Sequence, residues 1–216
     1  MTNTILQVTK LDPELIDQIK GSFDRLPETD HKDGKFRLRK YSLIELRTTF
    51  WNAKEEAEID QMDAKDFTQS EDFNKHQGGM KRTFENIEND VLQSDAFKEI
   101  CLVFKRACDL ISGQQMDVHQ MRVKCSGGAA QLSPEGWHQD GYDCVAMIGI
   151  DRRNIIGGEA LLSTSKTEGP FLKATLETGT MLIIDDSYLW HNGRSIQPID
   201  DNEEAWMDIL ILTVKK

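Results

Sequence analysis

Residues 144–163 read CVAMIGIDRRNIIGGEALLS, and this stretch decides the fold class. Residues 144–150 are mostly apolar, the turn-forming segment NIIGGE interrupts the run, and a second apolar run follows at 160–163. Short strands that are separated by glycine-containing turns, with no helix between them, are typical of antiparallel β-sheet proteins. The stretch therefore predicts two strands, at 144–150 and 160–163.

The same pattern continues on both sides of this stretch. Further apolar or alternating runs are separated by the turn-forming segments GGAA, TEGP, ETG and PIDDNEE. Many short strands without intervening helices indicate a sandwich, a jelly roll or a barrel. We expect residues 114–216 to form this β core, with its other strands at 118–125, 171–177, 180–184 and 209–214.

The N-terminal half, residues 1–113, has a different pattern. Residues 12–26 predict an amphipathic helix with Asp12 as its N-cap and Pro13 in its first turn. Apolar residues recur every three or four positions at 94–111, which predicts a second helix. We expect these helices to pack on the β core, so that the chain forms one structural domain of mainly β, α+β class.

Two further segments of the N-terminal half have local patterns of their own. Residues 36–46 alternate in polarity and predict a strand. Residues 52–66 are charged and poor in β-forming residues, which predicts an exposed helix or a loop. The second predicted helix begins after Ser94 and ends before Gly113.

The composition limits the classes of function. Thirty-seven acidic residues against 26 basic ones give a formal net charge of -11, which argues against binding to nucleic acid or to an anionic membrane. The N-terminus has no basic leader followed by an apolar stretch, and no run approaches the ~20 apolar residues of a membrane span. We therefore expect a cytoplasmic protein. Four cysteines without zinc-site or redox spacing are expected to be reduced packing residues, namely Cys101, Cys108, Cys125 and Cys144.

A candidate metal site begins just before the fold-determining stretch. The cluster comprises His138, Gln139 and Asp140. A second histidine, His191, occurs later in the chain, after the strand-like run at 180–184. On an extended strand alternate side chains share a face, so His138 and Asp140 could bind one ion while Gln139 points away. Two imidazoles and one carboxylate on one side of a metal leave its other positions open, as in the facial triad of non-haem Fe(II) oxygenases.

The bare pattern of two histidines and an aspartate is not specific to iron. It is compatible with a satisfied buried histidine near two surface residues, and it also describes a catalytic zinc site. The predicted fold favours a metal site, because both segments would meet at the mouth of a barrel where rigid strands hold them.

Longer segments around these residues resemble a known family. They are PEGWHQDGYDCVAMIGIDRRNIIGGEA at 134–160, LETGTMLIIDDSYLWHNGRSIQP at 176–198 and MDILILTV at 207–214. Together with FRLRKYS at 36–42 and FNKHQGGMKRTFE at 73–85, they are similar to the bacterial 2-oxoglutarate-Fe(II) dioxygenase family that includes L-isoleucine 4-hydroxylase. The resemblance covers most of the chain from residue 34 to residue 214.

The resemblance implies a fold, a cofactor and a reaction. The fold would be a double-stranded β-helix, a cupin-like jelly roll with flanking helices. His138, Asp140 and His191 would bind Fe(II), and 2-oxoglutarate and O2 would take the remaining positions on the metal. The enzyme would hydroxylate a small substrate, most simply a free L-amino acid, and would release succinate and CO2.

The residue that anchors 2-oxoglutarate is less evident. In the relatives an arginine directly precedes the aspartate of the last strand, and here that position is Met207. Arg194 could substitute if its side chain turned back into the barrel, although a solvent-facing loop residue is the simpler interpretation. Arg122 shares a polar strand face with Gln120, which indicates either a cavity that binds the co-substrate or a structural ion pair.

Other residues allow both a functional and a structural interpretation. Arg37, Arg39 and Arg82 could bind the carboxylate of an amino acid or could form surface ion pairs. Asp185 and Asp186 could orient a ligand histidine or could end a strand. The glycines Gly157 and Gly158 indicate a turn or a close ligand approach, the segment with Asn74, Gly78 and Gly79 could form a lid, and we interpret His31, His76 and His119 as structural or surface residues.

Three function classes remain compatible with the sequence. The leading hypothesis is a 2-oxoglutarate-dependent hydroxylase of a small molecule. Met207 leaves open a metal- and ligand-binding jelly-roll protein without oxygenase turnover, and the metal pattern leaves open a zinc hydrolase. Neither nucleic acid nor a membrane is an expected partner, and the oligomeric state is left open, with a homodimer compatible with the sequence.

Overall fold

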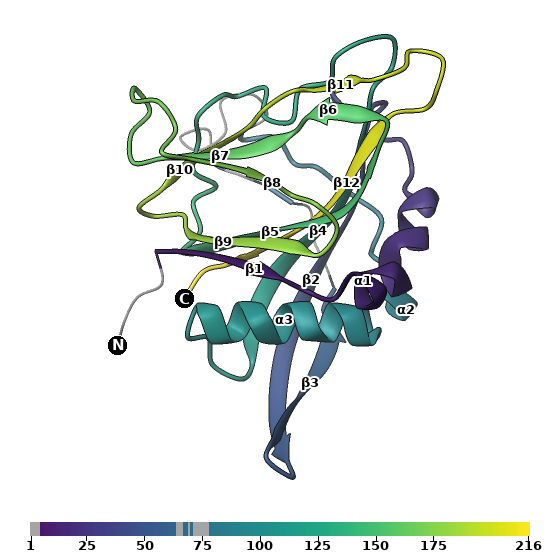
Figure 1. Ribbon diagram of the computed structural model, residues 1–216. Coiled ribbons are helices and arrows are strands. Elements are labelled where there is room, and N and C mark those ends of the chain that lie inside the picture. The colour runs from purple at the N-terminus through teal and green to yellow at the C-terminus, as the bar shows by residue number, and fades with distance from the viewer. Residues whose placement is uncertain (1–4, 64–66, 69, 71–77) are drawn as a thin grey trace.

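The computed structural model describes residues 5–63, 67–68, 70 and 78–216, and most of them belong to layered β-strands (Figure 1). A seven-stranded antiparallel sheet, here called the major sheet, has the strand order β1-β9-β5-β12-β4-β2-β3. Its strands are β1 (Leu6–Lys10), β2 (Arg37–Trp51), β3 (Lys54–Gln61), β4 (Gln114–Lys124), β5 (Cys144–Arg153), β9 (Thr180–Asp185) and β12 (Trp206–Val214).

Shorter strands form a second layer over one face of the major sheet (Figure 1). We call it the minor layer. The two facing antiparallel layers confirm the jelly-roll fold that the sequence predicts. The minor layer contains a three-stranded sheet of β10 (Trp190–Gly193), β7 (Glu159–Ser163) and β8 (Leu172–Thr175), and a pair of β11 (Ile196–Pro198) and β6 (Ile155–Gly157).

Helices cover the outer face of the major sheet (Figure 1). The side chain of Asp12 caps the first helix by accepting from the backbone N–H of Glu14 at 3.0 Å. Ser94 accepts from the backbone N–H of Phe97 at 3.2 Å, so both predicted N-caps are confirmed. The helices are α1 (Pro13–Lys20), which continues into the 3-10 turn η1 (Gly21–Arg25), α2 (Asn89–Leu92) and α3 (Asp95–Ala107).

Both faces of the central strands β5, β9 and β12 are largely buried, which explains their nearly continuous apolar sequences. In β9, Met181 and Ile183 belong to the core beneath the helices, whereas Leu182 and Ile184 belong to the core between the two layers. The alternation of side chains along these central strands therefore directs successive buried residues to opposite cores. Residues that face the minor layer are those that can reach the candidate site.

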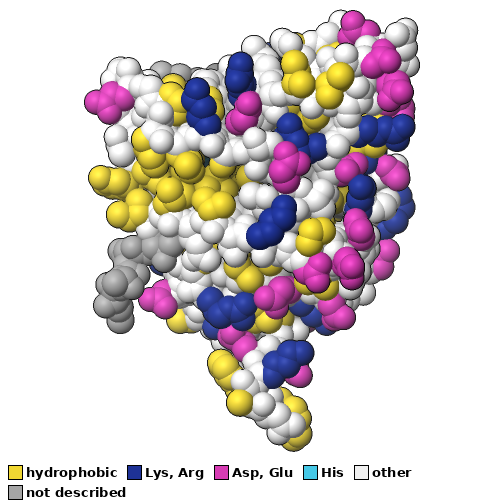
Figure 2. Space-filling model, viewed as in Figure 1, with side chains coloured by type: hydrophobic (Ala, Val, Ile, Leu, Met, Phe, Trp, Pro, Cys, Tyr) yellow, Lys and Arg dark blue, Asp and Glu magenta, His cyan; other side chains and the backbone are white. Residues whose placement is uncertain are grey.

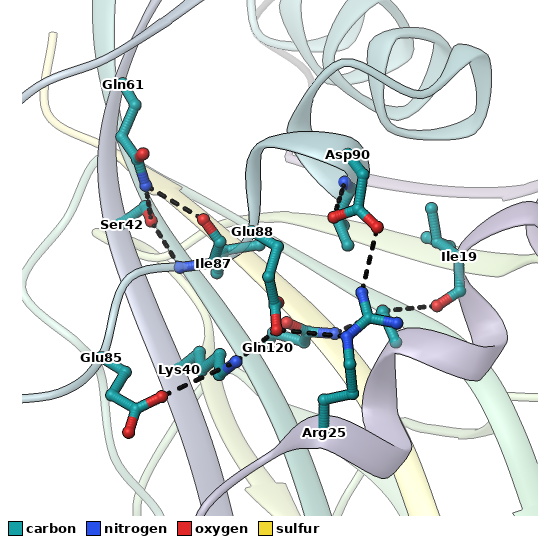
Figure 3. A network of polar contacts seen from close by, with 12 residues as sticks. Ile19, Arg25, Lys40, Ser42, Gln61, Glu85, Ile87, Glu88, Asp90 and Gln120 are labelled. Carbon is teal, nitrogen blue, oxygen red and sulfur yellow. Dashed lines mark hydrogen bonds and ion pairs between the residues drawn. The ribbon is translucent and has the colours of Figure 1, made fainter.

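Polar contacts attach strand β2 to the helical side of the major sheet (Figure 3). Lys40, whose side chain is buried, forms an ion pair with Glu88 just before α2. The hydroxyl of Ser42 accepts from the backbone N–H of Ile87 at 3.0 Å and from the amide of Gln61 at 2.7 Å. Lys40 and Ser42 thereby hold one face of β2 against the helical side. The residues that alternate with them face the minor layer.

The structure corrects the prediction for residues 52–66. Residues 54–61 form strand β3, which pairs with β2 along its whole length, so the expected helix or loop is wrong there. Asn52 and Ala53 adopt φ values of 48° and 61°, which close a tight hairpin. Cross-strand pairing outweighs the weak β-propensity of the charged residues. The hairpin extends beyond the body of the molecule (Figure 1), and residues 64–66 lie outside the described residues.

The boundaries of other elements also differ from the predictions. Helix α3 ends at Ala107 because Asp109 adopts a left-handed φ of 54°. The sequence did not predict β1, β6, β10 or β11 as strands, because each is short. Residues 1–113 contribute β1, β2 and β3 to the same major sheet as the C-terminal half. Among the residues that the structure describes, every helix is too short or too polar to span a bilayer.

Candidate metal centre and its cavity

The structure brings His138, Asp140 and His191 together. One possible ligand atom from each residue lies within 4.8 Å of the other two. The Nε2 atom of His138 is 3.8 Å from Asp140 Oδ1, and the Nε2 atom of His191 is 3.5 Å from Asp140 Oδ2. Two imidazoles and one carboxylate that converge from one side form a donor set that suits Fe(II).

The backbone pairs the two histidine segments directly. His191 lies in β10, and His138 forms an isolated antiparallel bridge with it. The backbone N–H of His138 donates to the carbonyl of His191 at 3.0 Å, and the reverse bond is 2.9 Å long. His138 is therefore held by this single bridge rather than by the longer extended strand that its alternation with Asp140 suggested.

Asp186 holds the third ligand in place. It is fully buried, and its Oδ2 atom accepts from the backbone N–H groups of Asp140, Gly141 and Tyr142 at 2.8, 2.9 and 3.2 Å. Its Oδ1 atom lies 3.1 Å from His191 Nε2. One carboxylate thus fixes the backbone around Asp140, and it contacts His191 through the same Nε2 atom that faces Asp140. Of the two acidic residues that the sequence suggested for this role, the site uses Asp186.

Hydrogen bonding prepares His138 for a metal. Its Nδ1 atom lies 2.9 Å from the carbonyl oxygen of Gly136, so Nδ1 carries the proton and donates it. The lone pair of Nε2 then points toward the other ligands. Burial and the neighbouring His191 lower the pKa of His138, which favours the neutral form. Burial alone would lower the pKa of His191 as well, but Asp186 and Asp140 raise it.

The three candidate ligands line a cavity that also contains arginine side chains. Arg37 and Arg39 come from the inward-facing positions of β2 and join the triad at this cavity. Three of its other polar lining residues are Arg82, Glu135 and His119. Positively charged groups thus stand beside a candidate cation site, an arrangement that suits a ligand with carboxylate groups.

His119 is a cavity residue that sequence reasoning missed. It is 5% exposed, and it lies in β4 on the same face as Met121, which also lines the cavity. Alternation within β4 was the signal that could have found it, but the polar residues Gln120 and Arg122 favoured the opposite face. Glu135 had no local pattern that could have indicated its role.

The structure does not bring Arg122 to the cavity. Its guanidinium group lies on the helical side of the major sheet, where two nitrogens bind the carboxylate of Asp208 at 2.7 Å each. A third nitrogen lies 2.8 Å from Asp24, and the group stacks 4.5 Å from the ring centroid of Trp206. The polar face of β4 results from this buried ion pair, together with Gln120, which donates to Ser22 at 2.6 Å.

Arg194 also lies away from the candidate ligands. Its side chain is 65% exposed, and its Nη1 atom is 3.5 Å from Glu159. The ion pair holds it on the outside of the minor layer rather than in the cavity.

A different arginine adjoins Met207. Arg152 of β5 is the direct cross-strand partner of Met207, and its Nη1 atom lies 3.6 Å from the Met207 sulfur. Its Nη2 atom donates to the carbonyl of Gly157 at 2.6 Å. A Cβ atom at Gly158 would lie 3.0 Å from Nη1, so this glycine lets the guanidinium approach the cavity wall.

This donor set inside a jelly roll defines a class, the non-haem metal oxygenases. The chain belongs to the 2OG-Fe dioxygenase family, whose model matches residues 20–213. Members of this family use Fe(II) as cofactor and 2-oxoglutarate as co-substrate, and the triad of this chain fits that iron. The protein is therefore a 2-oxoglutarate-dependent iron dioxygenase that acts on a small molecule with O2.

Solved structures support the fold. A bsmA homolog from Methylobium petroleophilum PM1 is 25% identical, with 99% of this chain and 89% of that chain covered and a TM-score of 0.76. IDO from Bacillus thuringiensis is 19% identical, with coverages of 97% and 94% and a TM-score of 0.72. The Fe(II)/(alpha)ketoglutarate-dependent dioxygenase TqaL is 12% identical, with coverages of 98% and 82% and a TM-score of 0.69. Among curated protein sequences, none matches the chain.

Proposed function

We propose that this dioxygenase hydroxylates a free L-amino acid in the cytoplasm, as in the branch of the family that includes L-isoleucine 4-hydroxylase. One observation carries the proposal: the arginines of β2 line the same cavity as His138, Asp140 and His191. A guanidinium group there can bind a substrate carboxylate and place a carbon near the metal. The side of the molecule in Figure 2 carries interspersed acidic and basic side chains next to an apolar patch, and the net charge of -11 fits a small substrate better than a polyanion.

His138, Asp140 and His191 would hold the iron, and Asp186 would hold the backbone around Asp140 in place. An iron bound there would supply the site at which O2 oxidises 2-oxoglutarate to succinate and CO2 and replaces a substrate C–H bond by C–OH. The residues of the chain bind and orient the substrate and exclude water, and apolar walls from β5 and β12 such as Val145, Met147 and Ile209 serve this purpose.

Arg152 is our proposed anchor for the distal carboxylate of 2-oxoglutarate. The resemblance places an arginine at position 207, and Arg152 reaches the same region from the paired strand. Met207 is an adaptable side chain that can move aside for a ligand. An arginine on β5 would then replace an arginine on β12 in the same row of the sheet.

The role of Arg152 is tested by the kinetics of 2-oxoglutarate consumption. Arg152→Met should raise the KM for 2-oxoglutarate by about 10- to 100-fold, since a hydrogen-bonded charge pair contributes about 1.5–3 kcal/mol. Iron affinity should not change. Arg153→Met changes the adjacent outward-facing residue and is the control, which should keep the wild-type KM for 2-oxoglutarate. A wild-type KM in Arg152→Met as well would refute the assignment.

The activity itself has a direct test. Under anaerobic conditions, Fe(II) plus 2-oxoglutarate should produce the weak visible band of the chelate. Succinate release from labelled 2-oxoglutarate should then depend on one or a few members of a panel of the twenty proteinogenic amino acids, with a product heavier by one oxygen in mass spectra. A chelate band without turnover of any amino acid would refute the substrate class and leave the dioxygenase assignment intact.

A further inference from the structure

Arg39 is a cavity-lining charge without a carboxylate partner in the described part of the chain. Its Nη2 atom lies 3.1 Å from the sulfur of Met121, and its guanidinium carbon lies 5.5 Å from the ring centroid of Phe84. A thioether is a weak acceptor, and a guanidinium group has five N–H donors. On the opposite face of the same strand, Lys40 has the carboxylate of Glu88 as its partner.

Like charges surround Arg39. Burial, together with the positive charges of Arg37 and Arg82, lowers the pKa of Arg39 to about 9. A crowded guanidinium that pairs with no carboxylate among the described residues is energetically costly. The cost is offset when an anionic ligand enters the cavity and takes up the free donors.

Glu135 lines the same cavity as Arg39 and the candidate metal ligands. Its side chain is 12% exposed, and its Oε1 atom is 3.3 Å from His138 Nε2. It raises the pKa of Arg39 and also that of His138, so its charge acts on both groups. When Nε2 binds a metal it has no proton to donate, and the carboxylate of Glu135 is then available to another cation.

Unpartnered polar atoms point to a bound ligand in the same part of the cavity. Among the described residues, His119 Nδ1 and Arg37 Nε are buried and have no hydrogen-bond partner. Buried polar groups in folded proteins are nearly always bonded, so orphan atoms that line a cavity indicate a partner that arrives from outside the chain.

We propose that Arg39 and Glu135 form a zwitterion site, in which Arg39 binds the α-carboxylate and Glu135 binds the α-ammonium of a free amino acid. This inference rests on the proposed function and deepens it, because it requires that both ends of the amino acid be unblocked. Peptides, amino-acid amides and N-acylated amino acids would each leave one buried charge without a partner, and the enzyme rejects them for that reason.

Ligand binding to the anaerobic Fe(II)/2-oxoglutarate protein tests the site. Isothermal titration calorimetry would first identify the proteinogenic L-amino acid that binds most tightly. The same titration then uses two analogues with the same side chain, the primary amide and the acid that lacks the α-amino group. We expect each analogue to bind about 10- to 100-fold more weakly, the range expected for one charged hydrogen bond.

Variants assign each end of the ligand to one residue. Glu135→Gln should weaken binding of the amino acid about 10- to 100-fold but leave binding of the des-amino acid unchanged. Arg39→Met should weaken binding of the amino acid by the same factor but leave binding of the primary amide unchanged. The matched controls are Glu45→Gln and Arg47→Met in the C-terminal half of the same strand β2. Neither should change the affinity for the amino acid or for its analogues.

A stability measurement separates this role from a structural one. If Arg39 serves the ligand, Arg39→Met should raise the Tm of the ligand-free protein, because an unpaired charge leaves the interior. A lower Tm with unchanged amino-acid affinity would overturn the inference. Loss of iron binding in Glu135→Gln would also overturn it, since Glu135 would then be a metal ligand. In both cases a persistent chelate band in the wild-type protein would leave the dioxygenase assignment standing.

Discussion

Asp186 shows how much a single buried carboxylate can organise. Three backbone N–H groups and one imidazole surround its two oxygens. Each of these groups would lose this partner if the carboxylate were removed, and buried polar groups are rarely left without one. The geometry of the metal site therefore depends on a residue that need not touch the metal.

Asp186→Asn should lower the affinity for Fe(II) by about 10- to 100-fold, the usual effect of removing a partner that orients a metal ligand. The amide keeps one acceptor oxygen in place of two, so an N–H donor would face either the backbone N–H groups around Asp140 or the imidazole of His191. Anaerobic titration with Fe(II) measures the effect. The neighbouring Asp185→Asn, whose carboxylate accepts only from Ser187 among the hydrogen bonds described for it, should retain wild-type affinity, and equal losses in both variants would contradict the assignment.

Arg122 is expected to matter for stability rather than for co-substrate binding. Arg122→Met leaves Asp208 buried without its bidentate partner, which costs about 3–5 kcal/mol. Chemical denaturation should show this loss, while the KM for 2-oxoglutarate stays at the wild-type value. The double variant Arg122→Met/Asp208→Leu should recover much of the stability, since neither charge remains. A raised KM with unchanged stability would instead support Arg122 as the co-substrate anchor.

Strand β5 passes very close to residues 176–179, which connect β8 and β9. An ideal Cβ at Gly149 would lie 2.2 Å from the carbonyl oxygen of Leu176, and the Gly149 carbonyl accepts from the N–H of Gly179 at 2.9 Å. Opposite Gly149 the pairing with β12 shifts register between Asp208 and Ile209. Only a glycine allows this close crossing.

Gly149→Ala should therefore lower the free energy of unfolding by about 1–3 kcal/mol or more, because backbone must move to admit the methyl group. Thermal and urea denaturation measure the change. Gly21→Ala is the control, since nothing lies within 4 Å of a Cβ there and its φ is -63°; it should be neutral or stabilising. A harmless Gly149→Ala would mean that the crossing is looser than the structure shows.

Elements with strong periodicity could be predicted from the sequence, and elements that depend on pairing could not. Helix α3 has apolar residues at helical spacing and a serine cap, and both signals are local. Strand β3 is mostly charged, and pairing with β2 makes it a strand. Strand β10 has four residues and becomes recognisable only beside β7.

The candidate site divides in the same way. The triad was visible because its histidines and aspartate stand in a recognisable pattern, and family resemblance placed them together. The face of β4 that lines the cavity could not be predicted, since Arg122 and His119 offer equally polar choices and only the position of the helices decides between them. Arg152 acquires its position from a strand pairing that no local pattern reveals.

For the whole molecule, metal binding should stabilise the native fold. The ligands come from β10 and from the segment before β5, which are far apart in the unfolded chain, so the metal binds the folded state preferentially. At a free Fe(II) concentration of about 100 times Kd, the stabilisation is about 2.7 kcal/mol. Anaerobic differential scanning calorimetry should show a raised Tm, which a chelator reverses. His138→Ala should abolish the increase, and an increase that persists would place the metal elsewhere.

The cavity draws its two kinds of residue from different layers. His191 belongs to the minor layer, whereas Arg37, Arg39 and His119 belong to the major sheet. Redesign can exploit this separation. A library that varies the inward positions of β2 and β4 would search for new substrates while the iron ligands and their supporting carboxylate stay untouched, so altered selectivity need not come at the expense of the oxidising centre.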